Sequence, residues 1–101
     1  MRAVFYNSGV RTLIYFTREL PGLSPDLELA GFQVYEALAL SEVFYLVDQH
    51  PTARIVVDRT VENDAASELA QHYTTFRLNP GATAADILWE VSCLSSDGAV
   101  Q

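Results

Sequence analysis

The stretch Arg54–Asp58 reads RIVVD, with three β-branched apolar residues in a row and a carboxylate at its end. A short strand that is apolar at consecutive positions is typical of a parallel sheet covered by helices on both faces. On either side of it, the pattern predicts helices that begin near Ser41 and at Glu62, each with apolar residues on one side. A strand between two helices favours a right-handed crossover and therefore an α/β fold.

The alternation of strands and helices extends outward from Arg54–Asp58 over most of the chain. The predicted strands are 2–6, 32–37, 54–58 and 74–78, and the predicted helices cover 10–20, the segment from Ser41 to Pro51, the segment after Glu62, and 83–94. Thr83 and Asp86 are expected to form a capping box at the start of the last helix. This order predicts one three-layer α/β/α domain over residues 1–94, with a mostly parallel sheet of about four strands. Residues 95–101 are expected to form a frayed C-terminal tail.

The segment Val10–Leu20 is compatible with two structures. Its apolar residues recur at helical spacing, and Ser8 can cap a helix that begins there, so a helix is favoured. The segment is also rich in β-branched and aromatic residues, and it follows an Asn-Ser-Gly sequence that suits a hairpin turn. A strand is therefore the alternative for this segment.

Composition excludes several classes of function. Six basic and 13 acidic residues give a net charge of −7 at pH 7, and such a surface repels nucleic-acid phosphates. Every basic residue is an arginine, which excludes chemistry that needs lysine, such as a Walker-type phosphate loop or a Schiff base. The single cysteine, Cys93, excludes an internal disulfide and a zinc site of several thiolates. We expect a cytoplasmic protein without a signal peptide and without membrane contact.

Three strings of the sequence carry a resemblance to a known family. Gly31–Ala37 reads GFQVYEA, Arg54–Asp58 reads RIVVD, and Phe76–Pro80 reads FRLNP. In this spacing they resemble the receiver domain of two-component response regulators, which has the flavodoxin-like fold of chemotaxis regulators. Receivers typically have Gly-Tyr-x-Val-x-x-Ala, then a strand that ends in aspartate, and Tyr-Leu-x-Lys-Pro before the last helix. The resemblance implies a flavodoxin-like fold with Asp58 at the phosphoacceptor position.

The sequence also departs from the receiver pattern at the positions that carry its chemistry. Receivers place two acidic residues after the first strand to hold magnesium, whereas this chain has Asn7 and Ser8 there. The receiver lysine is replaced by Asn79, which cannot neutralise an acyl phosphate. The segment between Asp58 and Asn79 is also too short by one β-α unit. In an alternative alignment, residues 54–60 match the fourth receiver strand and Thr60 matches its hydroxyl residue, so that no phosphoacceptor exists.

These observations predict a degenerate receiver-like module that signals through protein contacts. We expect no catalytic residue, no metal and no cofactor, and we expect a pocket formed by Asn7, Ser8, Asp58, Thr60 and Asn79. Exposed sheet edges favour self-association, so a homodimer is expected. The predicted interface residues are Tyr73, Phe76, Arg77 and Trp89. The alternative function is a small ligand-binding protein or enzyme that uses the crevice near Asn7, Asp58 and Asn79.

Overall fold

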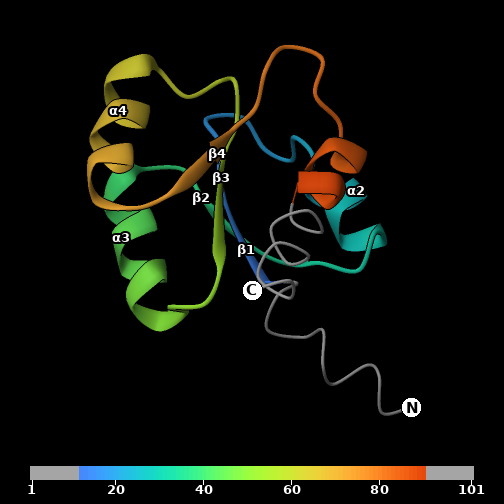
Figure 1. The fold of residues 1–101 in the computed structure, drawn as a ribbon, viewed down its shortest axis with the longest axis horizontal. Coiled ribbons are helices and arrows are strands. Elements are labelled where there is room, and N and C mark those ends of the chain that lie inside the picture. The colour runs from blue at the N-terminus through green and yellow to red at the C-terminus, as the bar shows by residue number, and fades with distance from the viewer. Residues whose placement is uncertain (1–11, 91–101) are drawn as a thin grey trace, which may run out of the picture.

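The computed structural model describes residues 12–90, which form a four-stranded sheet with helices on both faces (Figure 1). The strands are β1 (Thr12–Phe16), β2 (Gln33–Ala37), β3 (Arg54–Val57) and β4 (Thr75–Arg77). Every pairing is parallel, and the order across the sheet is β2-β1-β3-β4. The predicted α/β class with a parallel sheet of about four strands is confirmed.

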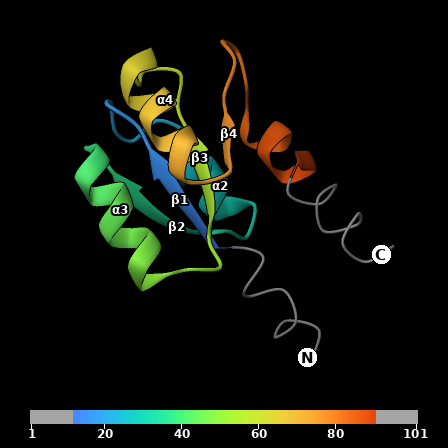
Figure 2. The same cartoon turned by 60° about the vertical axis from the view of Figure 1, so that its left-hand side comes forward.

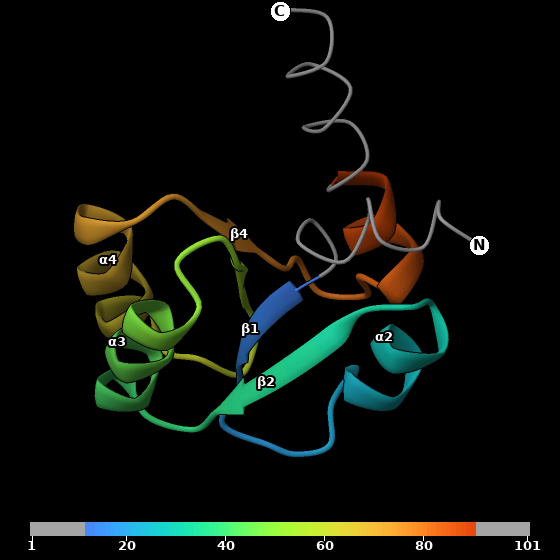
Figure 3. The same cartoon turned by 90° about the horizontal axis from the view of Figure 1, so that it is seen from below.

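The helices form two layers, one on each face of the sheet. Helices α3 (Leu40–Gln49) and α4 (Asn63–His72) cover one face, and α2 (Ser24–Leu29) covers the other together with the helical residues 84–90 (Figures 1 and 3). This is the three-layer, flavodoxin-like arrangement expected from the sequence. Within residues 12–90, every helix is too short or too polar to span a bilayer.

The prediction of a helix over Val10–Leu20 is wrong, because residues 12–16 of this segment form strand β1. Figure 2 shows β1 in the middle of the sheet, between β2 and β3. All five residues of β1 are buried, so apolar side chains are needed on both faces of the segment. A helix on the surface of the sheet would bury only one stripe, and this difference decides in favour of the strand.

The side chains of β1 alternate between two apolar cores. Leu13 and Tyr15 pack with Leu27 of α2 and with Ile87 of the last helix. Ile14 and Phe16 pack toward α3 and α4, in a cluster that also contains Val43, Ile55, Val57 and Leu69. Both faces of the sheet are thus apolar, as the RIVVD stretch predicts, and the buried polar residues Thr17 and Asp58 directly follow β1 and β3.

The last helix begins as predicted. The Asp86 carboxylate accepts a hydrogen bond from the Thr83 backbone N–H at 2.8 Å, which is the capping interaction expected for this pair. Other predictions lie outside the described residues: the strand 2–6, the pocket residues Asn7 and Ser8, positions 91–94 of the last helix, and the tail 95–101.

Candidate functional site

A pocket lies at the carboxyl edge of the sheet, where the strand order reverses. The chain leaves β1 toward β2 on one side and returns to β3 on the other side of β1, and open α/β sheets bind ligands at such a point. The pocket has a volume of about 320 Å³. Its lining comes from the loops after β1, β3 and β4, and it includes Glu19, Gly22, Asp58, Arg59, Thr60 and Asn79. Three of the predicted pocket residues, Asp58, Thr60 and Asn79, therefore meet at one place.

The Asp58 side chain is buried and its two oxygens are surrounded by donors. Its exposed fraction is 7%. Oδ1 accepts a hydrogen bond from the Tyr15 hydroxyl at 2.8 Å. Oδ2 accepts hydrogen bonds from the Thr60 hydroxyl at 2.7 Å and from the Thr60 backbone N–H at 3.1 Å. The Thr17 hydroxyl is a further donor, 3.1 Å from Oδ2. The carboxylate thus joins the carboxyl ends of the neighbouring strands β1 and β3.

Tyr15 extends this network from Asp58 to the loop that leads to α2. Its ring is fully buried in the core on the α2 side, and its hydroxyl oxygen accepts a hydrogen bond from the Leu23 backbone N–H at 3.0 Å. The same hydroxyl is donated to Asp58, so it is satisfied as donor and as acceptor. One phenol therefore fixes the position of the loop that forms one wall of the pocket.

The two buried acids of this network have pKa values displaced in opposite directions. Burial alone would raise the pKa of Asp58, but the hydrogen bonds from Thr60, Tyr15 and Thr17 outweigh it, and the pKa lies below the ordinary value. Burial raises the pKa of Tyr15 to about 12, helped by the adjacent Asp58 carboxylate and opposed by the Leu23 N–H. At neutral pH the pair is a carboxylate and a neutral phenol, so Asp58 acts as an acceptor of hydrogen bonds.

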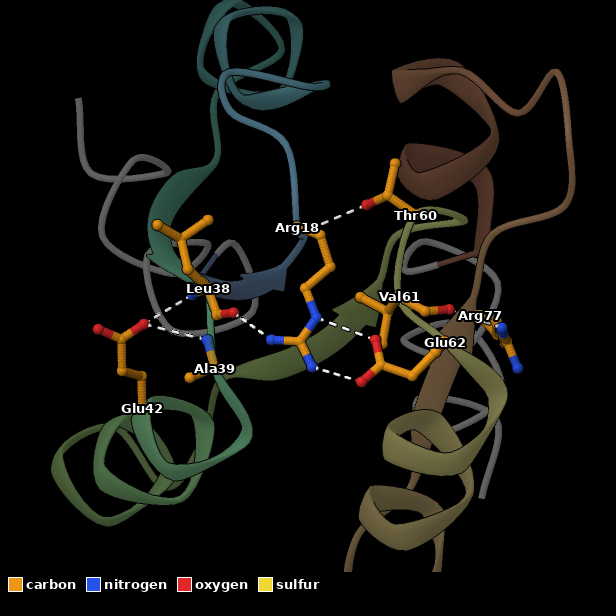
Figure 4. Close-up of polar contacts among 8 residues, drawn as sticks. All are labelled: Arg18, Leu38, Ala39, Glu42, Thr60, Val61, Glu62 and Arg77. Atoms are coloured by element: carbon orange, nitrogen blue, oxygen red, sulfur yellow. Dashed lines mark hydrogen bonds and ion pairs between the residues drawn. The ribbon is translucent and has the colours of Figure 1, made fainter.

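The Arg18 side chain connects the loop after β1 to the segments that lead into α3 and α4 (Figure 4). Its guanidinium donates to both carboxylate oxygens of Glu62, at 3.0 and 2.7 Å, and it also donates to the Leu38 carbonyl. Its backbone N–H donates to the Thr60 hydroxyl at 2.9 Å. The ion pair lowers the pKa of Glu62. Glu62 is thus the partner of an arginine, and no group of acidic, histidine or cysteine residues within residues 12–90 is arranged to hold a metal ion.

Sequence reasoning missed the hydroxyl and arginine partners of this site. Tyr15 is the last but one residue of strand β1, and Thr17 and Arg18 directly follow the strand. A strand prediction for this segment places all three near the same edge as Asp58. The helix predicted over Val10–Leu20 places these residues in a helical layer instead of in the sheet. The sequence signal that indicates this placement is the run of β-branched and aromatic residues in Val10–Leu20. That run favours the strand, which was the alternative prediction for this segment.

The residues predicted for an interface lie in three different environments. Tyr73 is partly buried against the core on the side of α3 and α4. Phe76 is partly buried against the core on the side of α2. Trp89 is 68% exposed on the last helix. Arg77 is exposed at the end of β4 and donates one hydrogen bond to the Val61 carbonyl at 3.0 Å (Figure 4). Phe76 and Trp89 also line one hollow of about 360 Å³ beside β4.

Comparison with protein-family models, curated proteins and solved structures finds no match to this chain. The assignment of a function therefore depends on the geometry of the carboxyl edge and on the chemistry of its residues.

Proposed function

We propose that this chain is a non-enzymatic, receiver-like interaction module in which the aspartate at the end of β3 is a structural tether. The strand order, the place of Asp58 at the carboxyl end of β3 and the three receiver-like strings support a relation to receivers. The hydrogen bonds around Asp58 support the loss of phosphoryl chemistry. Signalling in such a module takes place through contacts with other proteins.

The proposal rests on one observation: both oxygens of the Asp58 carboxylate already accept hydrogen bonds within the fold. A carboxylate that attacks phosphorus must present a free oxygen to the donor, and a cation must neutralise the charge that moves. Oδ1 and Oδ2 of Asp58 face Tyr15, Thr17 and Thr60, and little of the side chain reaches solvent. The residues that directly follow β1 are Thr17 and Arg18, and neither can bind magnesium as the acidic pair of a receiver does.

Incubation with acetyl phosphate and magnesium is expected to leave the intact mass of the protein unchanged. The reason is the absence of a free carboxylate oxygen on Asp58, as described above. A receiver domain that keeps its acidic pair serves as the positive control under the same conditions. A stoichiometric gain of one phosphoryl group that disappears in the Asp58→Asn variant would contradict the proposal.

The proposal includes self-association through β4. Strand β4 pairs only with β3, and no strand within residues 12–90 covers its outer edge. The hollow lined by Phe76 and Trp89 lies beside this edge, and these two aromatic side chains offer apolar contacts to a second copy, within a lining that also contains Asp86 and Glu90. Two β4 strands related by a two-fold axis can pair and bring these aromatic residues together.

Sedimentation equilibrium at micromolar concentration is expected to show a dimer, and Trp89→Ala is expected to shift the protein toward the 11.2 kDa monomer. The loss of a large exposed aromatic anchor typically weakens an interface by roughly 2 kcal/mol, or about 30-fold in affinity. Tyr45→Ala is the matched control, because Tyr45 is 64% exposed on α3, away from β4. A protein that stays monomeric as its concentration rises would exclude self-association, and a dimer unaffected by Trp89→Ala would exclude this edge.

A second candidate function, the binding of a small ligand, is favoured by one observation. The pocket of about 320 Å³ lies at the reversal of strand order and has the size of a small-molecule site. Asn79, Arg59 and Glu19 supply polar groups to it. This function does not need a reactive Asp58, so it is compatible with the tether.

A further inference from the structure

Two arginines gather at the carboxyl edge of the sheet on the side of β4. Arg59 follows Asp58 at the end of β3, and Arg77 is the last residue of β4. The two strands are in register, with Val57 opposite Arg77, and the pairing continues through the hydrogen bond from the Leu78 N–H to the Val57 carbonyl. Parallel pairing thus places both guanidinium groups at the same edge.

Arg59, Arg77 and Asn79 line one open pocket of about 400 Å³, together with Leu78 and Pro80. None of the described residues that line this pocket is acidic. This lining is unexpected in a chain with a net charge of −7. The acidic side chain closest along the chain, Asp58, is covered by the hydrogen bonds from Tyr15, Thr17 and Thr60.

The donors of this pocket are available to a ligand. A guanidinium has five N–H donors, and Arg77 uses one of them on the Val61 carbonyl, which holds it beside the loop that carries Arg59. Within residues 12–90, the side chains of Arg59 and Asn79 make no hydrogen bond and no ion pair. By contrast, all three guanidinium nitrogens of Arg18 at the same edge donate hydrogen bonds, to Glu62 and to the Leu38 carbonyl.

From this arrangement we infer that the Arg59–Arg77–Asn79 pocket binds a phosphate-type oxyanion without forming a covalent bond to it. Planar guanidinium groups match phosphate oxygens in pairs of hydrogen bonds, and an amide adds a neutral donor. The anion is either free phosphate or a phosphorylated side chain of a protein partner. The inference does not depend on the role of Asp58, because none of the three residues hydrogen-bonds its carboxylate.

Isothermal titration calorimetry of the full chain with inorganic phosphate tests the inference. Saturable binding at millimolar concentration is expected, and it should weaken by roughly tenfold in Arg59→Gln and in Arg77→Gln, since each removes a charged pair of donors. Arg54→Gln is the matched control. Arg54 lies at the start of β3, at the opposite edge of the sheet, and carries the same charge. Its loss should leave the affinity unchanged at moderate ionic strength.

Two results would overturn the inference: no saturable binding of phosphate by the unaltered chain, or an equal loss of affinity in Arg54→Gln, which would indicate a general effect of charge. Circular dichroism shows whether each variant is folded, and both arginines of the pocket are exposed, so their replacement should leave the fold intact.

A short phosphoserine peptide and its unphosphorylated form distinguish the sources of the anion. Tighter binding of the phosphopeptide than of phosphate assigns the site to a phosphorylated partner, and equal binding assigns it to the free anion. Trp89→Ala should bind phosphate normally, even if it is monomeric.

Discussion

Gly22→Ala is expected to lower the free energy of unfolding by about 3–5 kcal/mol, which would be among the largest effects of any single methyl group in this chain. Gly22 has a φ of +52°, a conformation that costs a residue with a side chain about 1–2 kcal/mol. A Cβ atom at this position would lie 2.3 Å from the Tyr15 hydroxyl oxygen. The Tyr15 ring cannot move aside, because it is fully buried and its hydroxyl bonds both Asp58 and Leu23. Urea denaturation followed by circular dichroism measures the loss.

Gly81→Ala separates the collision with Tyr15 from the cost of the backbone conformation. Gly81 has a φ of +85°, and a Cβ atom there would meet nothing within 4 Å. We expect a loss of only about 1–2 kcal/mol for this variant. In a Tyr15→Phe background, where the hydroxyl oxygen is gone, Gly22→Ala should cost less than it does in the unaltered chain. Equal losses for the two glycine variants would show that Tyr15 is not the obstacle.

Asp58→Asn is expected to destabilise the protein by about 2–4 kcal/mol at pH 7, although it changes few atoms. The carboxylate accepts hydrogen bonds at both oxygens, whereas an amide has one oxygen and directs an NH₂ group at the donors on its other side. One of Tyr15 or Thr60 then loses its acceptor inside the fold. Denaturant titration at pH 7 measures the change. Asp48→Asn, at an exposed position of α3, is the control and should stay within about 0.5 kcal/mol of the unaltered chain.

The pH dependence of stability provides an independent test of the same tether. The pKa of Asp58 is lower in the folded protein than the value of about 3.9 for an unfolded chain. Its contribution to stability is therefore complete above about pH 4–5 and is lost as the pH falls below 4, through the folded pKa. Asp58→Asn should lack this part of the acid-induced loss. An identical acid profile for the two proteins, or an Asp58→Asn variant no less stable than Asp48→Asn, would contradict the assignment of Asp58 as a tether.

Most of the fold was predictable because its strands and helices carry local signals. The buried strand Arg54–Val57, the helices on each side of it and the capping pair of Thr83 and Asp86 were all identified from short stretches of sequence. The central strand β1 was not predicted, because a short run of apolar residues is compatible both with a buried strand and with a helix. What decides its conformation is the pairing with β2 and β3, which lie far away in the sequence.

The candidate site was predictable only in part, for a similar reason. The rule that polar residues collect at the carboxyl ends of parallel strands brings Asp58, Thr60 and Asn79 together. It does not reveal that Tyr15 and Thr17 occupy the oxygens of Asp58, because these contacts join residues that are 43 and 41 positions apart. A reactive aspartate and a tethered one have the same local sequence, and only the long-range hydrogen bonds distinguish them.

The separation between Tyr15 and Asp58 also affects how fast the chain can reach its native state. Because each strand pair is parallel, no pair can form as a simple hairpin, and the central pair β1–β3 encloses α2, β2 and α3. The chain must lose the entropy of closing this long loop before the hydrogen bonds to Asp58 compensate for it. Folding should therefore be slower than in a helical bundle of equal length, and the tether should form late, after the central strands have met.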